Sequence, residues 1–507
     1  MNSPAIIVRA SWLACALVSG CASAYLRDAP PSAREPWPLA AEPNRARETA
    51  TERVLVADGR VYDLPELIDV AESNHPDTRI GWQRARQAAL AVGIPRAGYF
   101  PTIEAVTLIS YQHTDLPAPQ LGTSSVAANA SPFLPTISMG LPALASRSGS
   151  IGVDTFQIAP FVLVSQEVLN LGRRADVRAA KSQATAANAL FTAEHERVAF
   201  EVARSYFRRG AAHARAAVSR EALDRTRAIA EATEARFAHG VATAVERAEA
   251  RRELAEAEYN VTQAGALEIA AHAALVSAMG IDARIHIEVA DLDSVPLPAR
   301  LERSLDEYVQ AALAARPDLS AARARLPAAA AGVARATAAY APRVNAFGTA
   351  GGAILGGRVG DADLPTLKLP VFTAGVSVNW VIFDGGLREV QAGIARAQKS
   401  EAEEQVVKLQ HQVVQDVITA YNEVAASLSR YQAATALFAT AVTADDAATK
   451  SYLNGLATLT EAMTAQKARA LASAAREQAF ADALIATAAL ELAAGDLTSA
   501  KAAPRVR

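Results

Sequence analysis

The hydrophobic pattern is clearest in Ile394–Asn454, a stretch that contains neither glycine nor proline. Its apolar positions recur at steps of three and four: Val414, Val417, Tyr421, Val424, Leu428, Tyr431, Thr435, Phe438 and Val442, with Thr435 the polar exception. This heptad spacing predicts a helix that supercoils with a partner, and at about 1.5 Å per residue it would reach about 90 Å. Leu456–Ala494, which also lacks both helix breakers, follows Asn454-Gly455 and supplies that partner. We therefore expect a long helical hairpin.

A second pattern alternates apolar and polar residues with a period of two. In Ala374–Phe383 the residues Val376, Val378, Trp380 and Ile382 share one face, and Phe156–Leu169 behaves in the same way. Ile103–Tyr111 and Val344–Ala350 alternate less cleanly and predict two further strands. About ten alternating residues suit a membrane strand with an apolar lipid face and a polar lumen face, but also a soluble sheet with one wet face.

The segments between these strands are expected to be surface loops. Thr114–Gly152 is rich in Pro, Ser and Gly, and Gly351–Pro370 is rich in Gly, Asp and Pro.

The chain also repeats itself. Leu64–Asp77 matches Leu305–Asp318 at an offset of 241 residues (317 − 76). Asn-Leu-Gly-Arg-Arg at residues 170–174 matches Asp-Gly-Gly-Leu-Arg at residues 384–388. Further along, the segment around Phe237 and Gly240 matches the segment around Tyr452 and Gly455 at an offset of 215 (455 − 240). Each copy is therefore expected to contain a helix, two strands and a long helical hairpin.

Composition and charge exclude some classes of protein. The net charge of −3 provides no basic surface for nucleic acid. No run of about 18 apolar residues follows residue 25, so no membrane-spanning helix is expected. The two cysteines, Cys15 and Cys21, lie near the N terminus and leave no disulfide or cysteine metal site for the folded body.

The N terminus has the pattern of a secretory signal. Arg9 precedes the apolar stretch Trp12–Val18, and Val18-Ser19-Gly20-Cys21 resembles a bacterial lipobox, in which Cys21 would be lipidated and become the first mature residue. The alternative is an ordinary signal peptide with an incidental cysteine. Residue 22 is Ala and not Asp, which by resemblance to sorted lipoproteins favours the outer membrane.

These features divide the chain into five segments. They are a lipoprotein signal peptide (1–20), a lipid-anchored extended arm (21–60), a first structural repeat (61–288), a second structural repeat (289–496) and a C-terminal tail (497–507).

Physical reasoning then favours an oligomer. Four strands cannot close a barrel, and an open sheet edge is not tolerated in lipid, whereas three chains would supply twelve strands. Each hairpin exposes more than one apolar side, so hairpins from three chains would close a helical cylinder. Such an assembly encloses a conduit.

The duplicated helix start at Pro76 and Pro317, the strand end Phe383-Asp384-Gly385-Gly386 and the duplicated turns resemble the TolC-like outer membrane factor family, in its lipoprotein branch. The resemblance covers the chain from about Tyr62 to Asp496. It implies a mainly α fold with membrane β structure: a homotrimer with a 12-stranded β-barrel, four strands per chain, continuous with an α-helical coiled-coil barrel. It also implies an outer membrane efflux channel that extends into the periplasm and works with a periplasmic adaptor and an inner-membrane pump of the RND type.

The resemblance also assigns candidate site residues. Glu461 would form the acidic ring at the periplasmic gate, with Thr464 and Ala457 at the neighbouring gate positions. Three Glu461 side chains on one axis would raise one another's pKa and select cations. A solvated carboxylate on the helix surface is the alternative. Glu246 is the equivalent of Glu461 in the first repeat.

The turns of the two hairpins are assigned in the same way. Phe237 and Gly240 form the first turn, and Tyr452 and Gly455 form the second. The two aromatic residues are expected to brace these turns.

No enzyme and no cofactor are expected. No two of the eight histidines lie three or four residues apart, and neither a Walker loop nor a Gly-x-Ser-x-Gly motif occurs. The alternatives are a type I protein-secretion channel, a periplasmic adaptor, which has one hairpin and not two, and a structural coiled-coil lipoprotein. Outer membrane lipid is an expected partner and nucleic acid is not. The transported substrate is left open.

Overall fold

A computed structural model of the chain describes residues 60–117, 125–128, 137–140, 150–292, 295–298, 300–301 and 303–497, together with Pro30, Ser32 and Arg34. The chain divides into two compact units. One comprises the described residues of Met1–Leu90, Ser182–Leu326 and Ser400–Arg507, and the other those of Ala91–Lys181 and Pro327–Lys399.

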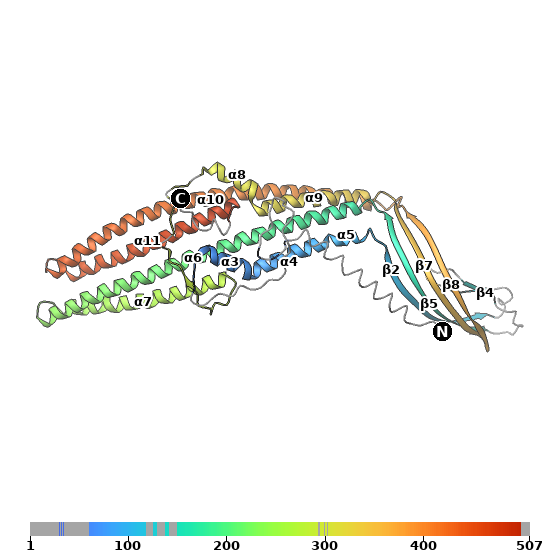
Figure 1. Cartoon of the computed structure of the whole chain (residues 1–507), viewed down its shortest axis with the longest axis horizontal. Coiled ribbons are helices and arrows are strands. Elements are labelled where there is room, and N and C mark those ends of the chain that lie inside the picture. The colour runs from blue at the N-terminus through green and yellow to red at the C-terminus, as the bar shows by residue number, and fades with distance from the viewer. Residues whose placement is uncertain are drawn as a thin grey trace. The chain divides into compact units, whose positions relative to one another are not determined.

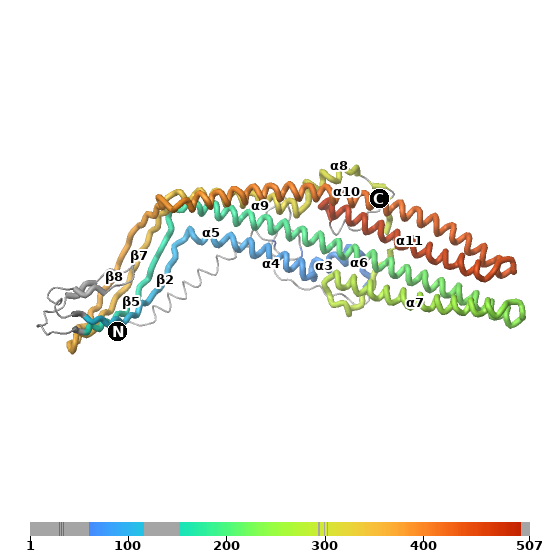
Figure 2. Tube along the Cα trace, turned by 180° about the vertical axis from the view of Figure 1, so that it is seen from behind, coloured from blue at the N-terminus to red at the C-terminus, as the bar shows by residue number. Residues whose placement is uncertain are grey.

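The first unit is built from helices, and its longest ones form two hairpins (Figure 1, Figure 2). Helices α6 (Arg173–Ala238) and α7 (Ala244–Ala278) form the first, and α10 (Leu387–Leu453) and α11 (Leu459–Ala494) form the second. The first residues of α6 and α10 belong to the second unit. The shorter elements are α3 (Leu64–Asn74), α4 (Pro76–Ala91), α8 (Leu305–Ala315), α9 (Pro317–Ala338) and the parallel pair β1 (Val61–Tyr62) and β6 (Glu288–Val289). The predicted long hairpin at Ile394–Ala494 is confirmed.

The predicted heptad seam of α10 is only partly buried within the chain. Val417 and Val424 are fully buried, together with Val413, in a cluster that also contains residues of α8, α9 and α11. Thr435, the polar position of the predicted seam, is exposed. Burial of these valines against α8, α9 and α11 therefore stabilises the segment of α10 from Val413 to Val424.

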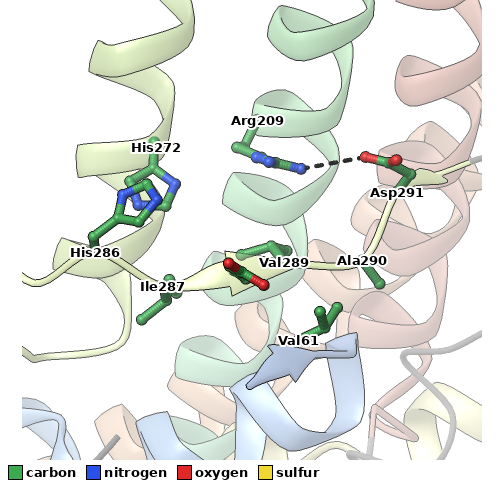
Figure 3. A pocket seen from close by; sticks show the side chains of 9 residues that line it. Val61, Arg209, His272, His286, Ile287, Val289, Ala290 and Asp291 are labelled. Carbon is green, nitrogen blue, oxygen red and sulfur yellow. Dashed lines mark ion pairs between the residues drawn. The ribbon is translucent and has the colours of Figure 1, made fainter. Parts of the chain in front are cut away.

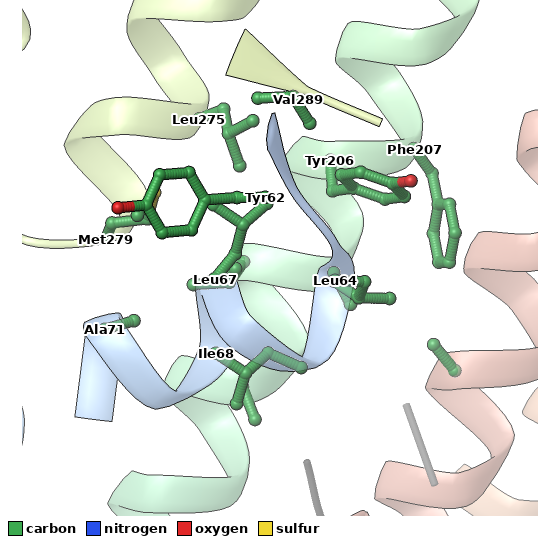
Figure 4. Close-up of a cluster of buried hydrophobic side chains, with 14 of the residues drawn as sticks. Tyr62, Leu64, Leu67, Ile68, Ala71, Tyr206, Phe207, Leu275, Met279 and Val289 are labelled. Atoms are coloured by element: carbon green, nitrogen blue, oxygen red, sulfur yellow. The ribbon is translucent and has the colours of Figure 1, made fainter. Parts of the chain in front are cut away.

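A second cluster joins both hairpins to the start of the described chain (Figure 4). Leu67 of α3 packs with Tyr62, with Phe207 of α6 and with Leu275 of α7, and Leu484 of α11 belongs to the same cluster. α3 begins with a capping box at Asp63, which stabilises its first turn. This turn carries Leu64 and Leu67 into the cluster.

The hairpins end in the same way in both halves of the chain. Gly280 has a φ of 72°, and a Cβ at this position would lie 2.5 Å from the Cα of His75, which precedes the Pro76 that opens α4. Gly495 has a φ of 71°, and its Cβ would lie 2.8 Å from the Cα of Arg316. Arg316 likewise precedes a helix-opening proline. Each half therefore needs a glycine at the point where the returning helix meets the start of a short helix.

Described residues of the expected N-terminal arm contact this unit. The indole N–H of Trp82 donates to the carbonyl oxygen of Pro30 at 3.0 Å, and Nε of Arg34 donates to Ser73 Oγ at 2.8 Å. These contacts place part of the arm against α3 and α4. The predicted boundaries of the signal peptide, arm, repeats and tail remain predictions.

The second unit contains a four-stranded antiparallel sheet in the order β2-β5-β7-β8. Its strands are β2 (Thr102–Pro117), β5 (Ser150–Leu169), β7 (Arg343–Val359) and β8 (Ala362–Asn379). The unit also contains α5 (Gly93–Ala97) and the separate pair β3 (Ser125–Ala128) and β4 (Ile137–Gly140). The four expected strands are present.

Three of the expected boundaries were wrong. Gly351–Pro370 is not a loop, because β7 and β8 continue through it to a tight turn at Gly360, where φ is 58°. The predicted loop Thr114–Gly152 contains the end of β2, the start of β5 and the pair β3–β4. β8 ends at Asn379 and not at Phe383.

The glycines that indicated a loop are needed by the sheet. A Cβ at Gly357 would lie 2.0 Å from the carbonyl oxygen of Asp154, and one at Gly351 would lie 2.3 Å from that of Pro160. β7 therefore approaches β5 so closely at these positions that no side chain fits between the backbones.

An arginine fixes the start of the long helix in each half. The guanidinium of Arg173 lies 5.0 Å from the ring centroid of Tyr99 and donates to the carbonyl oxygen of Glu167 at 2.9 Å. Arg388 lies 4.9 Å from the ring centroid of Tyr340 and donates to the carbonyl oxygen of Val381 at 2.7 Å. The contacts thus pair Arg388 with Arg173, and not with Arg174 as the sequence match suggested.

We predict that Gly280→Ala lowers the stability of the protein. A left-handed backbone strains any residue with a Cβ by about 1–3 kcal/mol, and the overlap with the backbone at His75 adds to this cost. Thermal unfolding of the detergent-purified protein measures the effect. Gly265→Ala is the matched control, because it lies within α7 with no atom near the added methyl group and should keep or raise the melting temperature. Equal melting temperatures for both variants would contradict the prediction.

Candidate functional site

The tips of the two hairpins carry most of the residues that the sequence assigned to a site. Gly240 and Gly455 have φ values of 70° and 75° and complete the turns after α6 and α10. In the second turn the Gly455 N–H donates to the Tyr452 carbonyl oxygen at 3.0 Å, and the first turn has the same bond between Gly240 and Phe237. Both glycines therefore occupy the left-handed position that ends a helix.

Glu461 forms a capping box at the start of α11. The Thr458 N–H donates to Glu461 Oε2 at 2.8 Å, and the Glu461 N–H donates to Thr458 Oγ1 at 3.2 Å. The backbone N–H and the hydroxyl of Thr458 lower the pKa of Glu461. Within one chain this carboxylate therefore stays charged, and the predicted mutual rise in pKa between copies remains a prediction.

Glu246 makes the same capping box with Thr243 at the start of α7, and the Thr243 N–H likewise lowers its pKa. Sequence reasoning missed both capping boxes, although the Thr-x-x-Glu spacing is their signature.

Tyr452 joins the two hairpins. It is 1% exposed, its hydroxyl lies 2.7 Å from Thr233 Oγ1 on α6, and Arg236 donates to its carbonyl oxygen at 2.9 Å. The guanidinium of Arg236 also lies 4.9 Å from the ring centroid of Tyr452. The bracing role expected of Tyr452 thus extends to the neighbouring hairpin.

The other predicted residues have more local contacts. The ring of Phe237 lies below the guanidinium of Arg247, with 4.0 Å from the guanidinium carbon to the ring centroid. Ala457 packs at the edge of a buried cluster of both hairpins that includes Leu459. Thr464 is exposed, and its hydroxyl donates to the Thr460 carbonyl oxygen at 2.7 Å.

Further polar contacts between the hairpins were not predicted. Gln466 Nε2 donates to Thr226 Oγ1 at 2.7 Å, and Lys467 Nζ lies 2.8 Å from a carboxylate oxygen of Glu253. These side chains give no signal in the sequence, because each pair joins positions more than 200 residues apart.

A charged group of residues lies a little further from the tips. The buried carboxylate of Asp445 lies 3.5 Å from Arg225 and 3.4 Å from Arg469, and Arg469 also lies 3.2 Å from Glu221. Two arginines thus compensate the charge of a carboxylate that would be costly to bury alone.

The sheet has a second candidate surface, an exposed apolar face. Ile103 of β2 pairs in register with Val164 of β5, and Tyr111 pairs with Phe156, so these side chains share one face. All four side chains are exposed, as are Phe372, Val376 and Val378 of β8.

A small polar pocket of about 350 Å³ lies beside β1 and β6 (Figure 3). The rings of His272 and His286 lie 5.0 Å apart, and Arg209 lies 3.8 Å from Asp291. Burial, followed by the neighbouring His286, lowers the pKa of His272.

In the part of the chain that the structure describes, no three His, Cys, Asp or Glu side chains gather closely enough to hold a metal ion. None of the helices described is both long and apolar enough to cross a membrane. Cys21, the predicted lipidation site, lies outside the described residues.

The fold and the hairpin tips can be compared with known proteins. The family model of the outer membrane efflux proteins matches residues 67–281 and 308–496. The chain therefore belongs to the outer membrane efflux protein family, a family of transport proteins, as the duplicated motifs predicted. A comparison with curated protein sequences found no match.

Solved structures of outer membrane channels share the fold. The outer-membrane channel OprN is 19% identical, with a TM-score of 0.67 over 86% of this chain and 90% of that chain. CmeC of Campylobacter jejuni is 18% identical, with a TM-score of 0.67 over 86% and 88%. MtrE of Neisseria gonorrhoeae, solved in an open state, is 18% identical, with a TM-score of 0.63 over 86% and 91%. These likenesses support the expected fold class, and the family decides against the periplasmic adaptor.

We predict that Glu461→Ala frays the first turn of α11, since the Thr458 N–H loses its acceptor, whereas Glu461→Gln keeps an acceptor and the turn. Hydrogen–deuterium exchange of residues 458–463 measures this. Faster exchange in Glu461→Ala alone is the expected result. Equal exchange in both variants and the parent chain would show that the cap does not hold the turn.

Proposed function

We propose that three copies of this chain form the outer membrane channel of a tripartite efflux system and export small molecules. The three sheets would together form a barrel of twelve strands in the membrane, and the hairpins would form a helical tunnel in the periplasm. A lipid on Cys21 would add an anchor in the outer membrane. The exposed apolar face of the sheet is the observation that carries this proposal.

The sheet supports the membrane part. Its outer strands, β2 and β8, each have one edge without a partner strand in the four-stranded sheet. The exposed apolar side chains on one face suit lipid, where unpaired backbone groups cost several kcal/mol each. Strands from two further copies would satisfy those groups and close the sheet.

The hairpin tips support the periplasmic part. Val241 and Val245 of the first tip and Leu453 and Leu456 of the second are exposed. We propose that a periplasmic adaptor, itself bound to an inner-membrane pump of the RND type, covers these side chains. The family is one of transport proteins, and we propose that the chain itself has no enzymatic activity, so the pump supplies the energy and selects the substrate.

The same tips would form the gate. Carboxylates of Glu461 from three copies, together with Thr464 and Ala457, would surround the mouth, and Glu246 of the first hairpin would lie behind them. Closing would depend on the contact between the hairpins at Tyr452 and Thr233, because the tips must separate for the mouth to widen.

Conductance in planar lipid bilayers tests the channel. The detergent-purified full-length protein should insert as a trimer that is mostly closed. We predict that Tyr452→Phe shifts the closed state toward the open one about fivefold per chain, because a buried hydrogen bond contributes about 1 kcal/mol. Tyr259→Phe changes an exposed tyrosine of α7 and is the control. If the two variants have the same open probability, Tyr452 does not contribute to the gate. The absence of any conductance would contradict the proposed function.

We also predict that Glu461→Gln lowers the cation selectivity of the channel while keeping the helix cap. Reversal potentials in a salt gradient measure selectivity. Because the amide still accepts a hydrogen bond, an effect of this variant reports on charge and not on the fold of the tip. An unchanged reversal potential would place Glu461 away from the conducting path.

A further inference from the structure

The apolar face of the sheet ends in charged residues on the side of the turn at Gly360. Because strands β2, β5, β7 and β8 pair in that order, each row of neighbouring residues can be followed across the whole sheet. One row contains three isoleucines and a lysine: Ile109, Ile158, Ile354 and Lys368. A second row, four residues further along β2 (113 − 109), contains only ionisable side chains: His113, Asp154, Arg358 and Asp363. Side chains alternate between the two faces of a strand, so both rows lie on the apolar face.

The charges of the second row compensate one another. His113 Nδ1 lies 2.7 Å from Asp154 Oδ1. Arg358 Nε lies 3.0 Å from Asp363 Oδ1. Opposite charges on neighbouring strands stabilise the pairing of those strands. Lys368 differs, because it is exposed and takes part in none of the ion pairs within the described part of the chain. It therefore presents an uncompensated positive charge beside the apolar side chains of β8.

The boundary between apolar and charged residues is slanted across the sheet. On β2 the last aromatic residue of this face is Tyr111, and its row continues across the sheet through Phe156, Gly356 and Thr366. On β8 the last apolar residue is Pro370, four residues (370 − 366) before the boundary that this row would give. Four residues span about 13 Å along a strand, and three strand spacings span about 14 Å. The boundary is therefore slanted by about 40°, which makes it level in a barrel whose strands tilt by about 35–45°.

We propose that this end of the sheet binds the phosphorylated glycolipid of the outer leaflet of the outer membrane, with Lys368 and Arg358 in contact with lipid phosphates. The inference rests on the proposed function, which places the apolar face in the membrane. The long helices α6 and α10 follow the opposite ends of β5 and β8, so the turn at Gly360 then lies on the outer side.

Lys368 is the main phosphate contact. Its methylene stem lies along the apolar part of β8, and its ammonium group reaches the headgroups, where it makes charge-assisted hydrogen bonds. Arg358 is the secondary contact, because the carboxylate of Asp363 competes with a phosphate for its guanidinium. The acyl chains of the same lipid lie against the exposed side chains of Phe372 and Val376.

Binding of lipid A to the detergent-purified full-length protein tests this inference. The probe is lipid A with two phosphates, and the measured quantity is its dissociation constant. We expect Lys368→Gln to raise this constant about fivefold, because a basic residue beside an anionic lipid surface contributes about that factor. Asp363→Asn should lower the constant, since Arg358 loses the competing carboxylate. With lipid A that carries no phosphate, the parent chain and Lys368→Gln should bind equally.

Two variants are matched controls. Lys368→Arg keeps the positive charge and should bind lipid A as tightly as the parent chain does. Arg343→Gln removes an exposed cation from the opposite end of β7, where Arg343 pairs in register with Asn379. It should leave the dissociation constant unchanged. Inorganic phosphate at the same concentration should not displace lipid A, because the apolar face contributes to the binding of the lipid but not of the free ion.

Conductance separates the failure of this inference from the failure of the proposed function. Lys368→Gln should form channels with the conductance of the parent chain. If it does, but binds phosphorylated lipid A as tightly as the parent, the binding surface is wrong and the proposed channel stands. If Lys368→Gln weakens the binding of both forms of lipid A equally, Lys368 does not contact a phosphate and the inference fails. If the parent chain neither inserts nor conducts, the proposed function fails, and this inference fails with it.

Discussion

Unpaired backbone groups at the edges of an apolar sheet are the constraint on which the proposed architecture depends. The edge of β2 and the edge of β8 each present N–H and C=O groups without partners in the sheet, while the exposed side chains beside them are apolar. Water can satisfy such groups at the surface of a soluble protein, but hydrocarbon cannot. In the proposed barrel, strands from other copies of the chain supply the missing partners.

The duplication gives the two hairpins the same local structure. Equivalent glycines, capping glutamates and arginines recur in both halves, so each half folds by the same local rules. The halves differ in the contacts that equivalent residues make. Tyr452 bonds to Thr233 of the neighbouring hairpin, whereas its equivalent, Phe237, has no hydroxyl and contacts Arg247 of its own hairpin. The two hairpins thus combine similar backbones with different surface chemistry.

Glu461 illustrates how one residue can have two roles. As the third residue of α11 it accepts the Thr458 N–H, which keeps its pKa low and its charge in place. The proposed gate needs that same charge at the mouth of the channel. Capping holds the carboxylate close to the turn, so the side chain is ordered before any second copy approaches.

The sequence by itself determined the local features of this protein. The heptad spacing specified the hairpin of α10 and α11, Gly240 and Gly455 specified the turns of the two hairpins, and the period of two specified four strands. It was misleading at Gly351 and Gly357, because glycine is common in loops and also where two strands come too close for a side chain.

Only the tertiary structure decided which elements meet. The order β2-β5-β7-β8, the bond between Tyr452 and Thr233, and the burial of Asp445 between two arginines all join residues far apart along the chain. The spacing of apolar residues shows which face of a segment is buried, but not which distant element covers that face. Such long-range pairs depend on the packing of several elements at once, and no single segment carries that information.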